Sequence, residues 1–227
     1  MSAFPLRVKG VIIDLDGTLL DTIPDLAAAA NSMLDELRRP ALDIELIRTF
    51  VGKGLSNLVE RTLTASYEVA PDPGLMARAL PIFEQHYVAV NGRHTTIYPG
   101  VKEGLDQLQR QGFALACVTN KSGRYTLPLL DLVRLAPYFR KVVSGDTLSV
   151  KKPDPAPLLH ACAALELAPS ETLMIGDSLN DTQAARAAGC PVFCVTYGYN
   201  EGHDVRDLDQ DALVDSLLEA AALIEKV

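Results

Sequence analysis

The feature that most constrains the fold is an alternation of short, continuously apolar runs with longer segments of helical period. A run without polar positions is typical of a parallel strand that is covered on both faces. The runs lie at residues 8–15, 113–118, 141–144, 172–175 and 192–196. Helical segments lie between them at residues 101–111, 156–165 and 181–188, and Gly112 and Gly189 end two of these. The alternation predicts an α/β fold with a doubly wound parallel sheet and right-handed crossovers.

The segment between residues 21 and 91 interrupts this alternation. It has no convincing strand pattern, and its helical patterns lie at residues 24–38, 44–51, 55–66 and 75–90, separated by turn signals. So much helix is too long for a plain crossover, and it predicts a helical subdomain inserted after the first strand. We therefore expect an α/β core formed by residues 1–20 and 95–227, and a helical cap formed by residues 21–94.

The end of the chain carries an acidic run at residues 204–211. This run is most simply a solvated loop. We expect residues 213–226 to form a terminal helix that follows it.

Composition and charge narrow the classes of partner. The net charge of −8 argues against a nucleic-acid-binding protein, because contact with a phosphate backbone needs clustered Lys and Arg. Residues 1–9 contain no apolar stretch of signal length, and no later run reaches the roughly 18 apolar residues of a membrane span. The cysteines lie in apolar stretches without zinc-type spacing, as buried reduced thiols do. We therefore expect a cytoplasmic monomer or homodimer that acts on a small molecule, without nucleic-acid or membrane partners.

Polar side chains follow four of the predicted strands, at the edge where ligands gather in open parallel sheets. They are Asp14 and Asp16 after the first strand, Thr119, Asn120 and Lys121 after the second, Lys152 after the third, and Asp177 and Asp181 after the fourth. Clustered carboxylates repel one another unless a cation compensates. These side chains provide only oxygen atoms as metal ligands, so a hard ion such as Mg²⁺ fits far better than zinc. The edge therefore predicts a Mg²⁺ site that admits a phosphate ester.

Asp14 and Asp16 are the candidates for covalent chemistry. They are two residues apart, so both lean to the same side of an extended chain. With Mg²⁺ and a lysine ammonium nearby, an Asp14 oxygen can attack phosphorus in line, and the resulting anhydride is readily hydrolysed. Asp16 can protonate the leaving oxygen and then deprotonate water. Thr119 and Asn120 can hydrogen-bond to the phosphoryl oxygens.

These residues also carry a family resemblance. The run Asp14-Leu15-Asp16-Gly17-Thr18 resembles the first motif of the haloacid dehalogenase-like hydrolase superfamily. Thr119, Lys152 before Pro153, and the run Gly176-Asp177-Ser178-Leu179-Asn180-Asp181 resemble the other three motifs, in the family's order and spacing. The resemblance covers essentially the whole chain, and it implies a Rossmann-like core.

The resemblance also implies a role for each motif residue. Asp14 would be the nucleophile, Asp16 the acid/base, and Lys152 the balancing charge, with Thr119 on the phosphate. The metal would be held by Asp14, by the main-chain carbonyl of Asp16 and by Asp177, with Asp181 as a supporting carboxylate. Without the resemblance, these carboxylates could instead cap turns or the following helix.

The helical insert resembles the cap of the group that contains phosphoglycolate phosphatases and β-phosphoglucomutases. Segments such as Val51-Gly52-Lys53-Gly54 are most similar to bacterial phosphoglycolate phosphatases. This similarity implies hydrolysis of a small acidic metabolite such as 2-phosphoglycolate. A single charge in the cap is more often a plain surface charge. Lys53 is the best candidate there for contact with a second anionic group, because glycines on both sides free its loop to approach a ligand.

Three other functions stay open on the sequence alone. The first is a sugar phosphomutase, although Thr18 is typical of the phosphatases and the mutases commonly carry Val there. The second is a phosphatase of broad specificity for sugar phosphates or nucleotides. The third is a non-enzymatic receiver-like module, which would have no use for a lid that excludes water.

Overall fold

The computed structural model describes residues 4–227; residues 1–3, which the predicted core range includes, lie outside the described part. A six-stranded sheet with strand order β6-β5-β2-β7-β8-β9 forms its centre, and all its neighbouring strands are parallel. The strands are β2 (Gly10–Ile13), β5 (Ala114–Val118), β6 (Lys141–Val143), β7 (Thr172–Gly176), β8 (Val192–Val195) and β9 (Ala212–Val214). The order runs outwards from β2 in both directions, so the predicted doubly wound sheet is confirmed.

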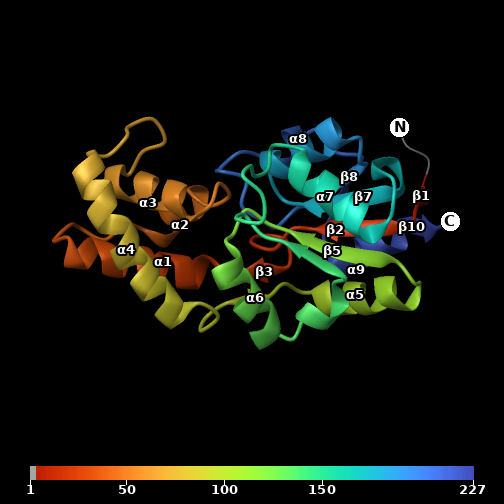
Figure 1. The fold of residues 1–227 in the computed structure, drawn as a ribbon, viewed down its shortest axis with the longest axis horizontal. Coiled ribbons are helices and arrows are strands. Elements are labelled where there is room, and N and C mark those ends of the chain that lie inside the picture. Colours follow the sequence, from red (N-terminus) through yellow and green to blue (C-terminus); the bar gives the residue numbers. More distant parts are fainter. Residues whose placement is uncertain (1–3) are drawn as a thin grey trace.

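Helices cover both faces of this sheet (Figure 1). One face packs against α5 (Val101–Arg110), α6 (Gly123–Leu132) and α9 (Leu217–Ala222), and the other against α7 (Ala156–Leu165) and α8 (Leu179–Ala188). Side chains along β2 alternate between the two apolar cores, with Val11 and Ile13 in one and Ile12 in the other. Burial on both faces explains why the strands read as continuous apolar runs.

Four further helices form a separate bundle beside the carboxyl ends of the strands, visible on the left of Figure 1. They are α1 (Ile23–Glu36), α2 (Ile44–Thr49), α3 (Leu55–Thr64) and α4 (Pro73–Val90), at the positions predicted for helices. The bundle has its own apolar core, in which Phe50, Phe83 and Tyr87 are fully buried. The chain enters it after β3 (Leu20–Asp21) and returns through β4 (Thr96–Ile97), and these two short strands pair antiparallel. The division into a core and a cap at residues 20/21 and 94/95 stays our interpretation.

The C-terminal part differs from the expected single helix. The segment contains β9, then α9, then β10 (Ile224–Lys226), which pairs in parallel with β1 (Leu6–Val8). The prediction of one helix was wrong because strand pairing with distant segments decides both ends. Ser216 begins α9, since its hydroxyl accepts a hydrogen bond from the Glu219 amide at 3.1 Å.

Two smaller expectations also need correction. Val8 was predicted in the first core strand but belongs to β1. The acidic run is only partly a solvated loop, because Arg186 forms ion pairs with Asp209 at 3.0 Å and with Asp211 at 2.8 Å. Short 3₁₀ turns complete the described chain at Ala136–Tyr138, Pro169–Glu171 and Val205–Asp207.

The four cysteines are free and buried, as expected. They are Cys117, Cys162, Cys190 and Cys194. Across residues 4–227, none of the helices combines the length and the apolar character that crossing a membrane requires.

Candidate active site

A pocket lies where the central strands of the sheet end and the helical bundle begins. Asp14 follows β2, Thr119 follows β5 and Asp177 follows β7, so three neighbouring strands deliver polar side chains to one edge. The full lining consists of Asp14, Asp16, Leu26, Val51, Gly52, Gly54, Leu55, Leu58, Thr119, Asn120, Lys121, Lys152, Asp177, Ser178, Asn180 and Tyr199. The space open to the centres of water molecules is about 40 Å³, which is room for roughly three waters.

Lys152 is the central cation of this pocket. Its ammonium lies 2.9 Å from Oδ1 of Asp14 and 2.6 Å from Oδ1 of Asp181, and it donates a hydrogen bond to the Val118 carbonyl at 2.8 Å. Burial would lower the pKa of this ammonium, but the charges of Asp14 and Asp181 outweigh that effect and raise the pKa above its ordinary value. Lys152 is therefore held charged between two carboxylates and a main-chain carbonyl.

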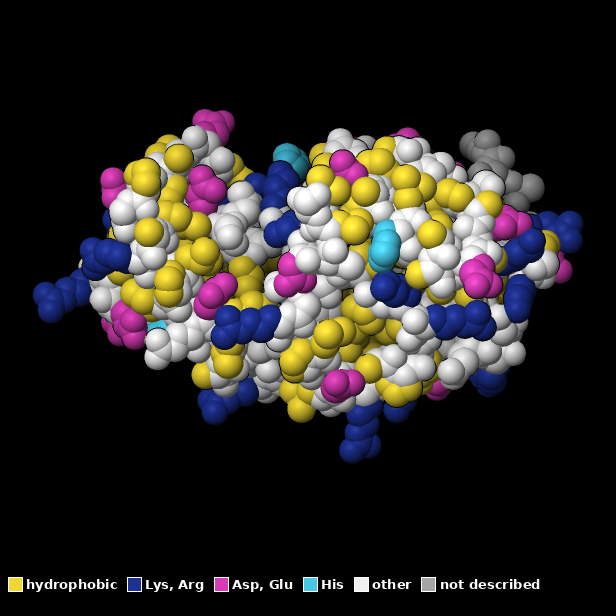
Figure 2. Space-filling model, viewed as in Figure 1, with side chains coloured by type: hydrophobic (Ala, Val, Ile, Leu, Met, Phe, Trp, Pro, Cys, Tyr) yellow, Lys and Arg dark blue, Asp and Glu magenta, His cyan; other side chains and the backbone are white. Residues whose placement is uncertain are grey.

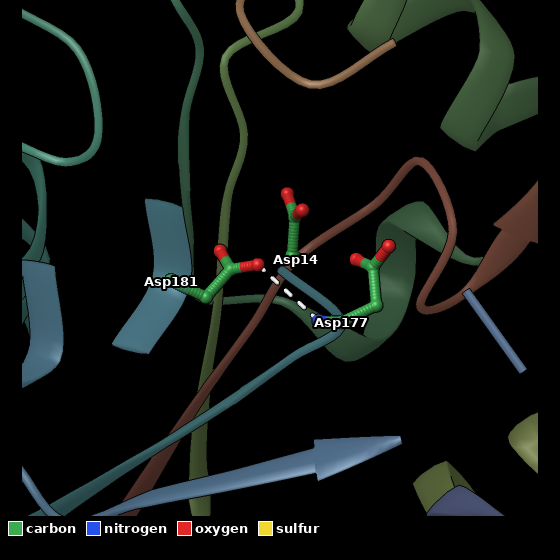
Figure 3. A group of neighbouring side chains, drawn as sticks. All are labelled: Asp14, Asp177 and Asp181. Carbon is green, nitrogen blue, oxygen red and sulfur yellow. Dashed lines mark hydrogen bonds between the residues drawn. The ribbon is translucent and has the colours of Figure 1, made fainter. Parts of the chain in front are cut away.

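Asp14, Asp177 and Asp181 form a compact group of carboxylates (Figure 3). One oxygen from each lies within 4.8 Å of the others. Burial raises the pKa of Asp14 to about 7, with Lys152 opposing the rise and Asp181 adding to it. Burial and the same neighbouring carboxylates raise the pKa of Asp177 well above its ordinary value. Three carboxylates face one ammonium, so this group lacks positive charge.

Asp181 stands behind the pocket and does not line it. Its Oδ2 accepts hydrogen bonds from the Asp177 amide at 3.2 Å, the Ser178 amide at 3.1 Å and the Ser178 hydroxyl at 2.8 Å. Its Oδ1 accepts from Lys152. Both oxygens are thus engaged, and Asp181 holds Lys152 and the start of α8 in place. Asp181 thus caps the start of α8, and its role as a supporting carboxylate for a metal stays a prediction.

Asp177 is oriented by neighbours on both sides. Thr18 donates its hydroxyl to Oδ1 at 2.8 Å, and the Tyr199 amide donates to Oδ2 at 2.6 Å. Gly17 has a φ of +89°, and a Cβ at this position would overlap the Asp177 carboxylate. A glycine is required there both for the backbone conformation and for the close approach.

Asp16 belongs to a different set of contacts from Asp14. Its Oδ1 accepts a hydrogen bond from the Thr22 hydroxyl at 2.7 Å. The Lys121 ammonium lies 3.0 Å from Oδ1 and 3.3 Å from Oδ2, and it also sits 4.9 Å from the centre of the Tyr87 ring. The sequence placed Lys121 only at the edge of the pocket. Its pairing with Asp16 has no local signal, because the partners are 105 residues apart.

The three predicted substrate contacts have different surroundings. Thr119 is buried on the pocket wall. Asn120 also lines the pocket, but its amide group donates to the carbonyls of Gly52 and Lys152, both at 2.9 Å, so its two N–H groups are engaged. Lys53 is exposed and does not line the pocket; its ammonium lies 3.0 Å from Glu201. In this arrangement Asn120 joins the bundle to the sheet edge, and a substrate contact by Lys53 stays a prediction.

Comparison with known proteins adds the family to this geometry. A family model described as haloacid dehalogenase-like hydrolase matches residues 11–195. This match runs from within β2 to the end of β8 and includes every residue of the pocket lining except Tyr199. The chain therefore belongs to the haloacid dehalogenase-like hydrolases.

The relatives extend over the full chain. A phosphoglycolate phosphatase from Nitrosospira multiformis is 57% identical over 223 residues, which cover 98% of each chain. One from Thiobacillus denitrificans is 54% identical over 226 residues, which cover 100% of each. Among solved structures, a predicted phosphoglycolate phosphatase from Haemophilus somnus superposes with a TM-score of 0.88 at 32% identity, covering 96% of this chain and 97% of that one.

Proposed function

We propose that this hydrolase is a Mg²⁺-dependent phosphomonoesterase that converts 2-phosphoglycolate to glycolate and phosphate through a phosphoaspartyl intermediate on Asp14. The observation that carries the proposal is the separation of two aspartates into two ion pairs. Asp14 forms an ion pair with Lys152, close to the other two carboxylates of its group. Asp16 forms an ion pair with Lys121 and accepts a hydrogen bond from Thr22. A nucleophile and an acid/base need different environments, and this pocket supplies both.

The carboxylate group fits a hard divalent cation. It offers only oxygen ligands, and burial together with mutual repulsion raises the pKa values of Asp14 and Asp177. We assign the ligands to Asp14, to the main-chain carbonyl of Asp16 and to Asp177, with Asp181 in support. A bound Mg²⁺ supplies charge neutralisation for the approach of a phosphate dianion.

The chemistry of the protein's own residues follows in two steps. An oxygen of Asp14 forms a bond to phosphorus while the ester P–O bond breaks, and the leaving oxygen takes a proton from Asp16. Asp16 then removes a proton from water, whose oxygen attacks phosphorus and releases phosphate from Asp14. Thr119 and Lys152 hold the phosphoryl oxygens and the Asp14 carboxylate in line throughout. Lys152 also favours the ionised form of Asp14 that the first step requires.

Two observations support a small substrate. The relatives that span the whole chain are phosphoglycolate phosphatases. On the face shown in Figure 2, the described Lys and Arg side chains are interspersed with Asp and Glu and form no broad basic surface, which favours a small molecule over a nucleic acid.

The buried free thiols support our expectation of a cytoplasmic location.

A phosphate-release assay over a substrate panel tests this function. With Mg²⁺ present, we expect a higher kcat/KM for 2-phosphoglycolate than for glucose phosphates, nucleotides or pyrophosphate. EDTA should abolish release, and added Mg²⁺ should restore it. Release that survives EDTA would contradict the metal assignment. Conversion of a sugar phosphate to its isomer without phosphate release would instead indicate a mutase, and no turnover of any ester would indicate a receiver-like module.

A further inference from the structure

The bundle side of the pocket lacks charge. The residues it contributes to the lining are Leu26, Val51, Gly52, Gly54, Leu55 and Leu58. An ionised carboxylate against such a wall would be costly without a cation. A second anionic group on the substrate must therefore find its cation on the sheet side of the pocket.

Two of the described lining residues carry positive charge, Lys121 and Lys152. Lys152 already faces two carboxylates, those of Asp14 and Asp181, and donates a hydrogen bond to the Val118 carbonyl. Lys121 directs its ammonium at one carboxylate, that of Asp16, and at the face of the Tyr87 ring. Lys121 faces one carboxylate where Lys152 faces two, so Lys121 is the lysine whose charge is available to another anionic partner.

Lys121 lies beside Asp16, the residue that protonates the leaving group in the proposed function. Under the proposed function, the leaving oxygen of the ester contacts Asp16. The Lys121 ammonium lies 3.0 Å from Oδ1 of that same side chain. Whatever the leaving group carries next to its ester oxygen therefore comes to lie beside this ammonium. In 2-phosphoglycolate a single methylene separates the ester oxygen from the carboxylate.

The surroundings of Lys121 keep it charged. Its side chain is buried, and burial alone would lower the pKa of the ammonium. The charge of Asp16 and contact with Tyr87 outweigh burial, so the pKa lies above its ordinary value. A charged, buried ammonium gives a strong and directional contact to an incoming carboxylate.

We propose that Lys121 determines substrate specificity by binding the carboxylate of the leaving group, and so selects phosphate esters with a carboxylate one methylene from the ester oxygen. On substrate binding, the ammonium is shared between Asp16 and this carboxylate, while Asp16 keeps the hydrogen bond from Thr22. The inference rests on the proposed function and assigns to Lys121 the contact that the sequence had suggested for Lys53.

The test compares two substrates that differ only in the group attached to the methylene. We would measure kcat/KM for 2-phosphoglycolate and for ethyl phosphate, in which a methyl group replaces the carboxylate. Lys121→Met should lower the ratio of the two values by on the order of 100-fold, as expected when one partner of a buried charge pair is removed. Lys121→Gln, which can still donate a hydrogen bond to Asp16, should lower the ratio similarly and serves if the Met variant does not fold. Lys102→Met, at an exposed lysine on α5, should leave the ratio unchanged.

The outcomes separate this inference from the function on which it rests. If the wild type prefers 2-phosphoglycolate and both Lys121 variants lose activity on the two esters by the same factor, Lys121 acts only through Asp16 and the specificity role is wrong. If the wild type hydrolyses other esters but shows no preference for 2-phosphoglycolate over ethyl phosphate, the proposed substrate itself is wrong, and the role of Lys121 with it.

Discussion

At the scale of single residues, two buried lysines separate aspartates that the sequence presents together. Lys152 is paired with Asp14 and Asp181, and Lys121 with Asp16. Asp14 and Asp16 are only two positions apart, yet they have different cations and different hydrogen-bond partners. Environment, and not residue type, thus divides nucleophile from acid/base in our proposal.

Asp25 is a buried carboxylate outside the pocket with a structural task. It accepts hydrogen bonds from the amides of Gly92 and His94, both at 2.9 Å, and from the amide and hydroxyl of Thr95 at 3.1 and 2.7 Å. It therefore joins α1 to the chain that returns from the bundle. We expect Asp25→Ala to lower the free energy of unfolding by about 3 kcal/mol or more, because several buried donors lose their partner.

Urea denaturation followed by circular dichroism measures this change. The matched control is Asp35→Ala, which removes an exposed carboxylate from the same helix and should cost less than about 0.5 kcal/mol. Equal stability of the two variants would show that the Asp25 contacts are not structural.

Residue positions differed in how far the sequence could predict them. Asp14, Thr119 and Asp177 were predictable because each lies at the carboxyl end of a strand that an apolar run indicates, and parallel strands end at one edge. The sequence did not indicate the partners of Asp25 and Lys121. Those partners lie 67 to 70 and 105 positions away, respectively, and only the folded chain brings them together.

At the scale of elements, the loop after β8 contacts the helical bundle through Glu201. Its carboxylate lies 3.0 Å from Lys53 and 3.1 Å from Arg61, whose guanidinium is buried. Glu201 adopts a left-handed φ of 50°, a conformation that costs energy for a residue with a side chain. These ion pairs, with the Asn120 contact to Gly52, hold the bundle over the pocket.

Glu201→Gln should weaken this closure. We expect kcat/KM to fall about fivefold, since a loss on the order of 1 kcal/mol is typical for a partly exposed ion pair. The difference from wild type should shrink at high salt, because ionic strength screens such pairs. Steady-state kinetics at low and high salt measure both effects, with Glu225→Gln on β10 as the exposed control. A variant indistinguishable from wild type at low salt would contradict the closure role.

Element predictions succeeded where the pattern is local. The four bundle helices were predicted from their period and turn signals, and the core strands from their apolar runs. The single C-terminal helix failed because β9 and β10 pair with β8 and β1, which lie far away in the sequence. A two-residue pair such as β3 and β4 is too short to leave a pattern at all.

At the scale of the whole molecule, the strand order explains where the chemistry lies. The sheet grows outwards on both sides of β2, so its crossovers diverge there and leave a crevice at the carboxyl ends of the strands. The bundle, inserted between β3 and β4, lies beside the carboxyl ends of the strands (Figure 1), and its residues line one side of the pocket there. One segment thus supplies the proposed nucleophile at the end of a strand, and a later one supplies a cover that separates the pocket from bulk solvent.

The most direct test of the account is to trap the intermediate on Asp14. The wild type would be mixed with 2-phosphoglycolate and Mg²⁺, quenched in acid during turnover and treated with borohydride, which reduces an aspartyl phosphate to homoserine. Peptide mass spectrometry should find homoserine at position 14 in the wild type and not in Asp14→Asn. That variant should keep its circular dichroism spectrum and release phosphate at least about 10³-fold more slowly. Phosphate release without the mark at position 14, or appreciable turnover by Asp14→Asn, would contradict the account.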